Sequence, residues 1–349
     1  MLRRLIRSLS CGLSASDPAA ADGPAPPERP SSQTEQAQQE RAVATSAPAL
    51  SAVVLSSPDF PLPPPDYIRQ HGESRTTGFV IAQVYKVEWR GVLLVAKWGE
   101  WVWPTEGTAC AFVGSHSSVP VAKYYGSYKH GNHLYQFYSF LPGQSLFDFC
   151  YQWTPADERD VVGNVLAMIK ELWTMPPPGY VGSFDRYGRG ALGGYLEPPP
   201  RRPGEPDKGT PARYPYDMHW PNASAFFDWV HDQYLRKGGD PSRWDADVEP
   251  GLARTAEPVF VHADLAARNV LVDANSGRVT GLIDFFPAGW YPREVQWLLL
   301  RGELENAREA GRHDVPFVEA LTEAVAGELT EPAKRAGPIW WDALFAVPV

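Results

Sequence analysis

Between residues 79 and 141 the apolar positions come in short runs of β-branched, aromatic and aliphatic residues, separated by turn signals. Runs of this length and composition are typical of β-strands. Arg90-Gly91 lies between the first two runs and predicts a hairpin, and Thr105 is placed to cap a short helix through Val113. The segment is therefore predicted to be a β-rich unit with one helix. The expected strands span residues 79–87, 92–98, 121–128 and 134–140.

After Pro142-Gly143 the apolar residues recur every three or four positions, as they do along one face of a helix. A segment rich in proline, glycine and arginine, at about 183–220, interrupts this pattern and is predicted to be a long loop, which is uncommon unless functional or disordered. The pattern favours an α+β protein, with a β-rich part over residues 66–141 and a mostly helical part over 142–349. The expected helices span 161–173, 223–235, 293–303 and 315–329.

Residues 1–65 are dominated by alanine, proline, serine and glutamine, without a sustained apolar period. Such a composition buries too little apolar surface to fold, so we predict a disordered tail. Its first ten residues are basic and place four apolar side chains on one helical face. Two interpretations stay open. The basic start is incidental in a cytoplasmic protein, which we favour, or residues 1–16 form a mitochondrial transit segment.

The overall composition limits the classes of partner. A formal net charge of −9 over 349 residues argues against an extended nucleic-acid or anionic-membrane surface. No apolar run approaches the roughly 18 residues of a membrane span. Three widely spaced cysteines favour reduced thiols in an intracellular protein. We therefore expect a soluble protein that binds neither nucleic acid nor membranes, and nothing in the sequence indicates its oligomeric state.

The most specific chemistry of the chain lies in residues 259–286. His262, Asp264 and Asn269 follow the order H-x-D-x-x-x-x-N inside aliphatic sequence, and Asp284 ends another apolar run. Nucleotide-dependent phosphoryl transfer needs such a set: a carboxylate orients and deprotonates the attacking hydroxyl, and oxygen ligands hold Mg²⁺ on the phosphates. Asp264 is the predicted base, and Asn269 and Asp284 are the predicted Mg²⁺ ligands. The plainer alternative is a turn between strands, but a turn needs one such residue rather than four in fixed order.

Lys97 is unusual because it ends an apolar strand segment. In a nucleotide site, a lysine at such a place contacts the phosphates and pairs with a helix carboxylate, for which Glu106 is the candidate. The alternative is an edge-strand lysine whose stem covers apolar surface while its amine reaches water. The Asp264 motif makes phosphate binding the better interpretation. Lys86 is a rival that lies nearer the hairpin turn.

Together, Lys97, Glu106, the Asp264 motif and Asp284 resemble the aminoglycoside phosphotransferase superfamily, in particular its fungal-type members. The resemblance runs from about residue 79 to beyond 300 and is supported by local strings at 119–126, 140–146, 268–272 and 289–294. It implies a protein-kinase-like fold of two lobes, with ATP between them. By position, residues 137–141 would then meet the adenine through backbone groups. The candidate nucleotide-binding residues of this strip are Phe137, Ser139 and Leu141.

Residues 262–269 are also similar to the catalytic loop of protein tyrosine kinases, H-R-D-L-A-A-R-N. Three departures argue against that reading. Ala263 replaces the arginine that binds a phosphorylated activation loop, Phe286 stands in place of the D-F-G glycine, and no A-P-E follows. The sequence therefore favours a small-molecule kinase over a protein kinase.

The chain also departs from the aminoglycoside phosphotransferase pattern. Phe285-Phe286 replaces a Trp-Glu-like pair after Asp284, and no clear glycine-rich loop precedes Lys97. These departures leave a catalytically weak pseudokinase or nucleotide-binding interaction module as the alternative. The leading expectation is ATP- and Mg²⁺-dependent phosphorylation of a hydroxyl on a small molecule that no motif identifies, with His262 bracing the loop rather than acting as a base.

Overall fold

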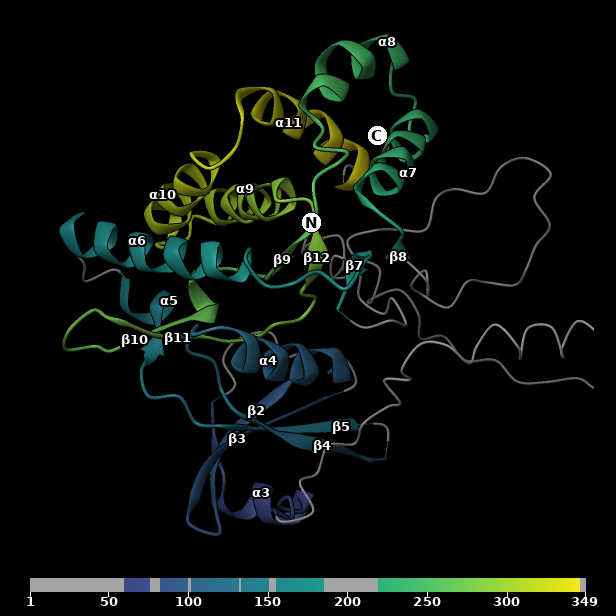
Figure 1. Ribbon diagram of the computed structural model, residues 1–349. Helices are drawn as coiled ribbons and strands as arrows, with labels where there is room; N and C mark the ends of the chain where they lie inside the picture. The colour runs from purple at the N-terminus through teal and green to yellow at the C-terminus, as the bar shows by residue number, and fades with distance from the viewer. Residues whose placement is uncertain are drawn as a thin grey trace, which may run out of the picture. The chain divides into compact units, whose positions relative to one another are not determined.

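Five antiparallel strands form the N-terminal lobe in the computed structural model, which describes residues 60–75, 82–99, 102–131, 133–150, 155–184 and 219–345. The strands lie in the order β1-β2-β3-β5-β4, so β3 and β5 are interior (Figure 1). This sheet confirms the β-rich N-terminal part of the predicted α+β fold. Its strands are β1 (Glu73–Ser74), β2 (Gln83–Trp89), β3 (Val92–Gly99), β4 (Tyr124–His130) and β5 (His133–Ser139).

The hairpin between β2 and β3 turns at the expected place. Arg90 and Gly91 both have positive φ, at 52° and 75°, which is the backbone of the two-residue turns that match the twist of paired strands. The register runs from Gln83 opposite Trp98 to Trp89 opposite Val92, and therefore seats Lys97 opposite Val84. Of the expected strand 79–87, residues 79–81 lie outside the described residues, and the observed strand begins at Gln83.

One face of this sheet is covered by the segment that leads into helix α3 (Pro65–His71). Ile68 is fully buried there among side chains of β2, β3 and β5. The preceding residues lie along the same face, since Trp89 donates to the carbonyl of Pro61 at 2.6 Å and Tyr128 to that of Pro63 at 2.7 Å. Residues 60–64 were expected to belong to the disordered tail. They are instead part of the packed lobe, because their backbone carbonyls and two apolar side chains find partners on the sheet.

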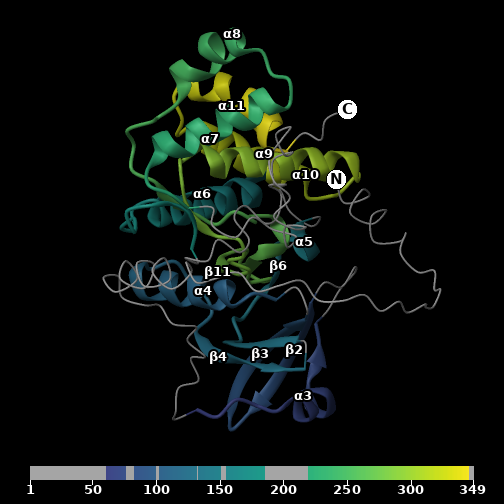
Figure 2. The same ribbon diagram turned by 90° about the vertical axis from the view of Figure 1, so that its right-hand side faces the viewer.

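Helix α4 (Pro104–His116) lies on the opposite face, between the sheet and the C-terminal lobe (Figures 1 and 2). The expected cap is wrong by two residues, because Trp103 holds the N-cap position and Thr105 is buried within the first turn. Pro104 explains the earlier start: its fixed φ and missing N–H suit the first helical position. The consequence for the site is that Glu106 lies in the first turn, facing inward at 5% exposure.

The C-terminal lobe is mostly helical, as predicted, and the four expected helices are present. Three further helices among the described residues of this lobe, α5, α8 and α11, were not predicted, and α11 encloses Pro338. The Pro/Gly/Arg-rich loop falls mainly on residues 185–218, outside the described part, but its ends pair as strands β7 (Val181–Ser183) and β8 (His219–Trp220). The helices are α5 (Leu146–Phe149), α6 (Pro155–Leu172), α7 (Ala223–Arg236), α8 (Pro241–Arg243), α9 (Glu294–Glu309), α10 (Val315–Ala326) and α11 (Glu331–Phe345).

Two small antiparallel sheets carry the site-bearing segments of this lobe. One has the order β8-β7-β12-β9 and the other β11-β10-β6. The main-chain N–H of Leu282 donates to the carbonyl of Pro120 at 2.9 Å, which ties the second sheet to the N-terminal lobe. The strands not yet given are β6 (Gln144–Ser145), β9 (Val259–Val261), β10 (Val270–Val272), β11 (Val279–Leu282) and β12 (Gly289–Tyr291).

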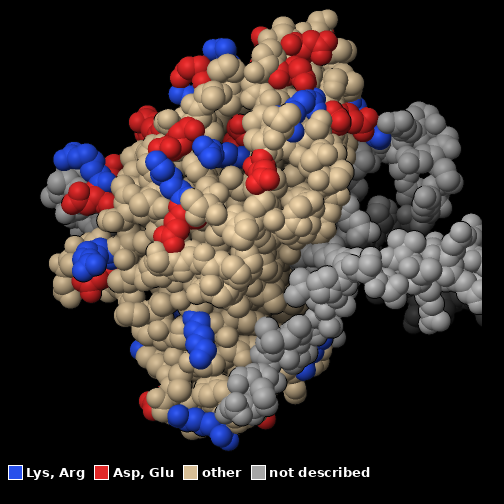
Figure 3. All heavy atoms as spheres, viewed as in Figure 1, with Lys and Arg blue, Asp and Glu red and all other residues tan. Residues whose placement is uncertain are grey.

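Charged side chains of both signs are intermixed on the face shown in Figure 3, mainly over the helical lobe. Within the described ranges, no helix combines the length and the apolar character that crossing a membrane requires.

Candidate active site

The segment that carries Asp264 leaves β9 through an unusual backbone turn. β9 is buried along its whole length, and Ala263, two residues after it, has a φ of 66°. Asp284, two residues after β11, has a φ of 62°. Left-handed conformations cost energy in residues other than glycine and concentrate at functional sites. Both expected acidic positions are therefore set by strained turns at strand ends, with His262 pointing into the core and Asp264 left partly exposed.

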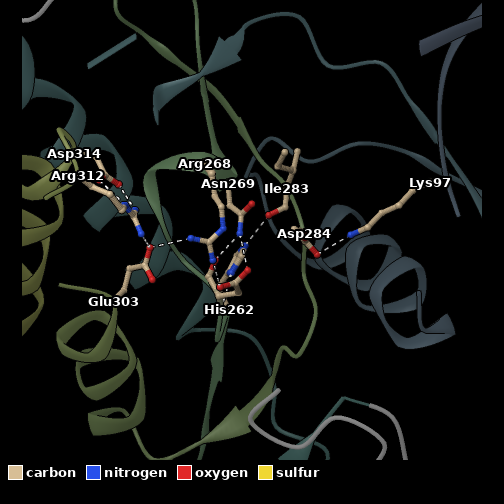
Figure 4. Close-up of polar contacts among 10 residues, drawn as sticks. Lys97, His262, Arg268, Asn269, Ile283, Asp284, Glu303, Arg312 and Asp314 are labelled. Atoms are coloured by element: carbon tan, nitrogen blue, oxygen red, sulfur yellow. Dashed lines mark hydrogen bonds and ion pairs between the residues drawn. The ribbon is translucent and has the colours of Figure 1, made fainter. Parts of the chain in front are cut away.

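His262 braces the two chemical segments against each other (Figure 4). Its Nε2 donates to the carbonyl of Ile283 at 3.1 Å, and its Nδ1 accepts from the main-chain N–H of Asp264 at 3.4 Å. Its own N–H donates to Gln296 of α9 at 3.1 Å. The ring is fully buried, and burial lowers its pKa to about 4, so the imidazole is neutral near pH 7. This geometry supports a bracing role.

Asp264 and Asn269 lie against each other at the start and end of the loop. The Nδ2 of Asn269 donates to Oδ2 of Asp264 at 2.9 Å and to its carbonyl at 2.7 Å. Arg268 donates to Oδ1 of Asp264 at 2.6 Å. Burial raises the pKa of Asp264, and the charge of Arg268 opposes that rise. A carboxylate held by two donors, with a quarter of its side chain exposed, is suited to receive a proton from an approaching hydroxyl.

Asp284 joins this group through the backbone and through Lys97. The N–H of Ile283 donates to the carbonyl of Asn269 at 3.0 Å, which places Asp284 one residue from that contact. Nζ of Lys97 lies 3.0 Å from Oδ1 of Asp284 and 2.8 Å from Oε2 of Glu106. The structure thus brings together residues that are up to 187 positions apart in the chain.

The environment of Lys97 removes the edge-strand alternative. β3 is interior, and only 17% of the Lys97 side chain is exposed. Burial alone would lower its pKa, but the carboxylates of Asp284 and Glu106 outweigh burial and raise it, so the amine stays charged. Burial also raises the pKa of Glu106, which Lys97 opposes. The rival Lys86 lies elsewhere, over the ring of Phe140 at 4.9 Å.

The expected adenine strip is only partly placed as predicted. Phe137 lies in the interior strand β5, paired with β3 on one side and β4 on the other, and its side chain is fully buried in the core beneath α3. Phe137 is therefore committed to the sheet and does not face the interlobe region. Ser139 and Leu141 lie at and beyond the strand end and are half-buried. The main-chain N–H of Ser139 already donates to the carbonyl of Lys123 at 2.8 Å, so this N–H is not available to a ligand.

The side chains after Asp284 pack rather than bind. Phe285 is fully buried with its ring 4.5 Å from that of His262. The ring of Phe286 lies 6.3 Å from that of Trp103, nearly parallel to it. Phe286, which stands where the aminoglycoside phosphotransferase pattern has a carboxylate, therefore packs against an aromatic ring and offers no polar group.

The donor set at Asn269 and Asp284 fits Mg²⁺. Because Nδ2 of Asn269 is held by Asp264, the amide oxygen would be the atom offered to a cation, and Asp284 would add a carboxylate that is one third exposed. Among the described side chains, no group of three or more His, Cys, Asp or Glu residues could hold a metal. Mg²⁺ usually takes one or two protein ligands and completes its octahedron with water and phosphate, so Asn269 and Asp284 would suffice as its protein ligands.

Sequence reasoning missed the residues that support this group. Gln296 holds the backbone of His262, and Glu303 holds Arg268 at 2.8 Å. Both lie on α9, about 35 residues downstream, and neither carries a local motif. Arg268 was noticed only as part of a family string, although its place one residue before Asn269 was the available signal.

The buried neutral state of His262 predicts a pH dependence of stability. The unfolded chain takes up a proton near pH 6.5, whereas the folded protein resists until about pH 4. Between these values the unfolded state binds more protons, so the free energy of unfolding should fall as the pH falls, by about 3 kcal/mol in all. Urea unfolding at pH 7.5, 5.5 and 4.5 measures the effect.

His262→Gln is the informative variant, because a neutral amide can keep the donor to Ile283 but cannot titrate. Its stability should be lower at pH 7.5 and should depend less on pH than that of the wild type. The exposed His71→Gln should retain the wild-type dependence. Equal losses on acidification in the wild type and His262→Gln would contradict the assignment.

Comparison with known proteins places the chain in a family. The sequence model of the phosphotransferase enzyme family matches residues 104–295, which are 192 of 349 residues, without singling out fungal-type members. Comparison with curated protein sequences found no match. Three solved aminoglycoside phosphotransferases are similar in fold at low identity. The type VIII aminoglycoside-3'-phosphotransferase is 17% identical, with 80% of this chain and 98% of that chain covered and a TM-score of 0.46.

For APH(4)-Ia the identity is 13%, with 79% and 95% covered and a TM-score of 0.45. For APH(3'')-Id from Streptomyces rimosus, which was also solved with ADP and streptomycin, the identity is 16%, with 78% and 92% covered and a TM-score of 0.44. The family match extends from the first residue of α4 to the start of α9. It therefore includes Glu106 and the segment from Asp264 to Asp284, but not Lys97. The chain therefore belongs to the phosphotransferase enzyme family.

Proposed function

We propose that this phosphotransferase transfers the terminal phosphoryl group of MgATP to a hydroxyl group of a small molecule. The observation that carries the proposal is the bridge made by Lys97, whose amine contacts both Glu106 and Asp284 within 3.0 Å. A lysine that is positioned by one carboxylate and adjoins a second is the arrangement that nucleotide phosphates and their Mg²⁺ require.

The remaining roles follow from the contacts around this bridge. Asp264 accepts the proton of the acceptor hydroxyl, with its carboxylate held by Asn269 and Arg268. Asn269 and Asp284 supply oxygen ligands for Mg²⁺, which when bound neutralises charge on the phosphates. Lys97 contacts the phosphates and Glu106 orients it. Of the strip, the backbone of Leu141 is the candidate for the adenine, since Phe137 is held within the sheet and the N–H groups of Ser139 and Phe140 already donate to the carbonyls of Lys123 and Leu93.

The short path after Asp284 supports a small acceptor rather than a protein. β12 begins at Gly289 and pairs with β9, and α9 begins at Glu294, ten residues after Asp284. A peptide-docking segment of the protein-kinase kind would have to be accommodated in that interval. The stretch is instead occupied by a paired strand and by the buried Phe285.

Mg²⁺-dependent nucleotide binding tests the proposal before the acceptor is known. With MgATP at about 100 times its Kd, the wild type should gain about 2.7 kcal/mol of stability. Asp284→Asn removes a charged ligand, and a loss of about 2 kcal/mol in binding would reduce that gain to about 0.9 kcal/mol. Thermal unfolding with and without MgATP measures both values.

The exposed Asp245→Asn is the matched control and should keep the wild-type gain. ATP with excess EDTA should stabilise none of the three proteins strongly. An equal gain for the wild type and Asp284→Asn would overturn the metal assignment. ATP consumption screened over hydroxylated metabolites then separates an enzyme from the alternative of a nucleotide-binding module, which would bind MgATP without turnover.

A further inference from the structure

A line of five alternating charges runs from Asp264 to the boundary between α9 and α10. Figure 4 shows its members from Arg268 to Asp314. Arg268 contacts Asp264 at 2.6 Å and Glu303 at 2.8 Å. Oε1 of Glu303 also accepts from Arg312 at 2.8 Å, and Nε of Arg312 donates to Asp314 at 2.9 Å. The residues come from three separate segments of the chain, so their alignment is a product of the fold.

The far end of this line is anchored and the near end is accessible. The Asp314 side chain is fully buried, and those of Arg312 and Glu303 are 21% and 16% exposed. Arg312 also lies over the ring of Phe147, at 5.4 Å. Arg268, in contrast, is 45% exposed. Arg312, itself held by the buried Asp314, therefore fixes the Glu303 carboxylate, which contacts the guanidinium of Arg268.

Arg268 uses two different nitrogens for its two carboxylates. Nη1 donates to Glu303 and Nη2 to Oδ1 of Asp264, while the other oxygen of Asp264 accepts from Asn269. Two donors on two oxygens fix the plane of the Asp264 carboxylate. The planar fork of arginine makes this possible, whereas the single ammonium of lysine has no such fixed geometry.

We propose that Arg268, held by Glu303, is a positioning residue that orients the Asp264 carboxylate toward the acceptor. The inference rests on the proposed function. Its physical basis is that phosphoryl transfer depends on the placement of reacting groups, and a misplacement of about 1 Å can cost about 100-fold in rate. An ion pair as exposed as Arg268 contributes little to stability, so its main effect should be on turnover.

The test uses the full chain and two readouts: ATP hydrolysis, with water as acceptor, and thermal stabilisation by MgATP. Arg268→Ala should lower kcat by about 10- to 100-fold, with KM for MgATP within about twofold of the wild type. Arg268→Lys should recover little of the loss, because it lacks the fork. Glu303→Gln should give a smaller loss, and Arg268→Ala/Glu303→Gln should match Arg268→Ala, because Glu303 acts through Arg268.

Arg308→Ala is the matched control, since Arg308 lies on α9 with Glu303, is 51% exposed like the 45% exposed Arg268, and pairs with a carboxylate, that of Glu319. It should leave kcat unchanged. A kcat of Arg268→Ala within twofold of the wild type, a change confined to KM, or a loss that follows a lowered melting temperature would overturn the inference while leaving the proposed function intact. A wild type that neither binds nor hydrolyses MgATP would overturn both.

Discussion

Asp264→Asn is expected to lower kcat by about 10²- to 10⁴-fold, the usual contribution of a positioned general base. Asparagine cannot take up the hydroxyl proton. Its amide nitrogen would also face one of the two donors that hold the carboxylate, Arg268 or Asn269. Because Asp264 makes no contact with Lys97 or Glu106 in the described structure, KM for MgATP should change little. Initial rates with saturating MgATP, measured on ATP hydrolysis and on an acceptor found by screening, give the comparison.

The controls for this variant separate chemistry from folding. Asp247→Asn replaces an exposed aspartate of the same lobe and should keep wild-type kcat. Stabilisation of Asp264→Asn by MgATP should match that of the wild type, which shows that the nucleotide site has formed. Unchanged turnover in Asp264→Asn would refute its assignment as the base.

Lys97→Met is expected to lower kcat/KM by about 10²- to 10⁴-fold, because the charged hydrogen bonds of a buried amine to phosphate are together worth about 3–5 kcal/mol. Methionine keeps the length and apolar stem of the side chain, and so preserves packing in β3. Steady-state kinetics over a range of MgATP concentrations measure the loss. The variant also changes stability, because Glu106 loses the charge that opposes its burial.

The stability of Lys97→Met should depend on pH through Glu106. The folded pKa of Glu106 lies above its unfolded value, and removing Lys97 raises it further, so the folded state holds a proton that the unfolded state releases. The free energy of unfolding of Lys97→Met should therefore fall as the pH rises from 5 to 8.

A double variant distinguishes the two roles of Lys97. Lys97→Met/Glu106→Gln should lose that pH dependence and regain stability, yet stay inactive. Lys334→Met, at a surface pair with Glu331, should cost less than about 1 kcal/mol. If Lys97→Met retained wild-type kcat/KM, the phosphate-binding role would be wrong.

The helical and strand periodicity of the sequence was enough to predict the α+β class and most elements, because both follow from local apolar spacing. Errors occurred where a tertiary contact or a single proline decided the outcome. Pro104 moved the start of α4 away from Thr105. Residues 60–64 look like tail by composition, but the sheet supplies their partners.

In the candidate site, too, local features could be predicted from the sequence and tertiary contacts could not. The Asp264 motif could be found because its polar residues interrupt an apolar segment, which is a local signal. That strands flank Phe137 on both sides could not be predicted, because apolar spacing does not show which strands pair with β5. The support from Gln296 and Glu303 left no local trace, since each acts across more than 30 residues.

By itself, the sequence determined the chemical groups available: a carboxylate at Asp264, side-chain oxygens at Asn269 and Asp284, and an amine at Lys97. Those follow from residue type and spacing. Only the tertiary structure decided that Lys97 bridges Glu106 and Asp284, and that Arg268 ties Asp264 to a line of charges ending at buried Asp314. The physical reason is range: the identity of a donor or acceptor is fixed by covalent structure, but a hydrogen bond requires atoms to lie within about 3 Å, and only folding brings distant segments that close.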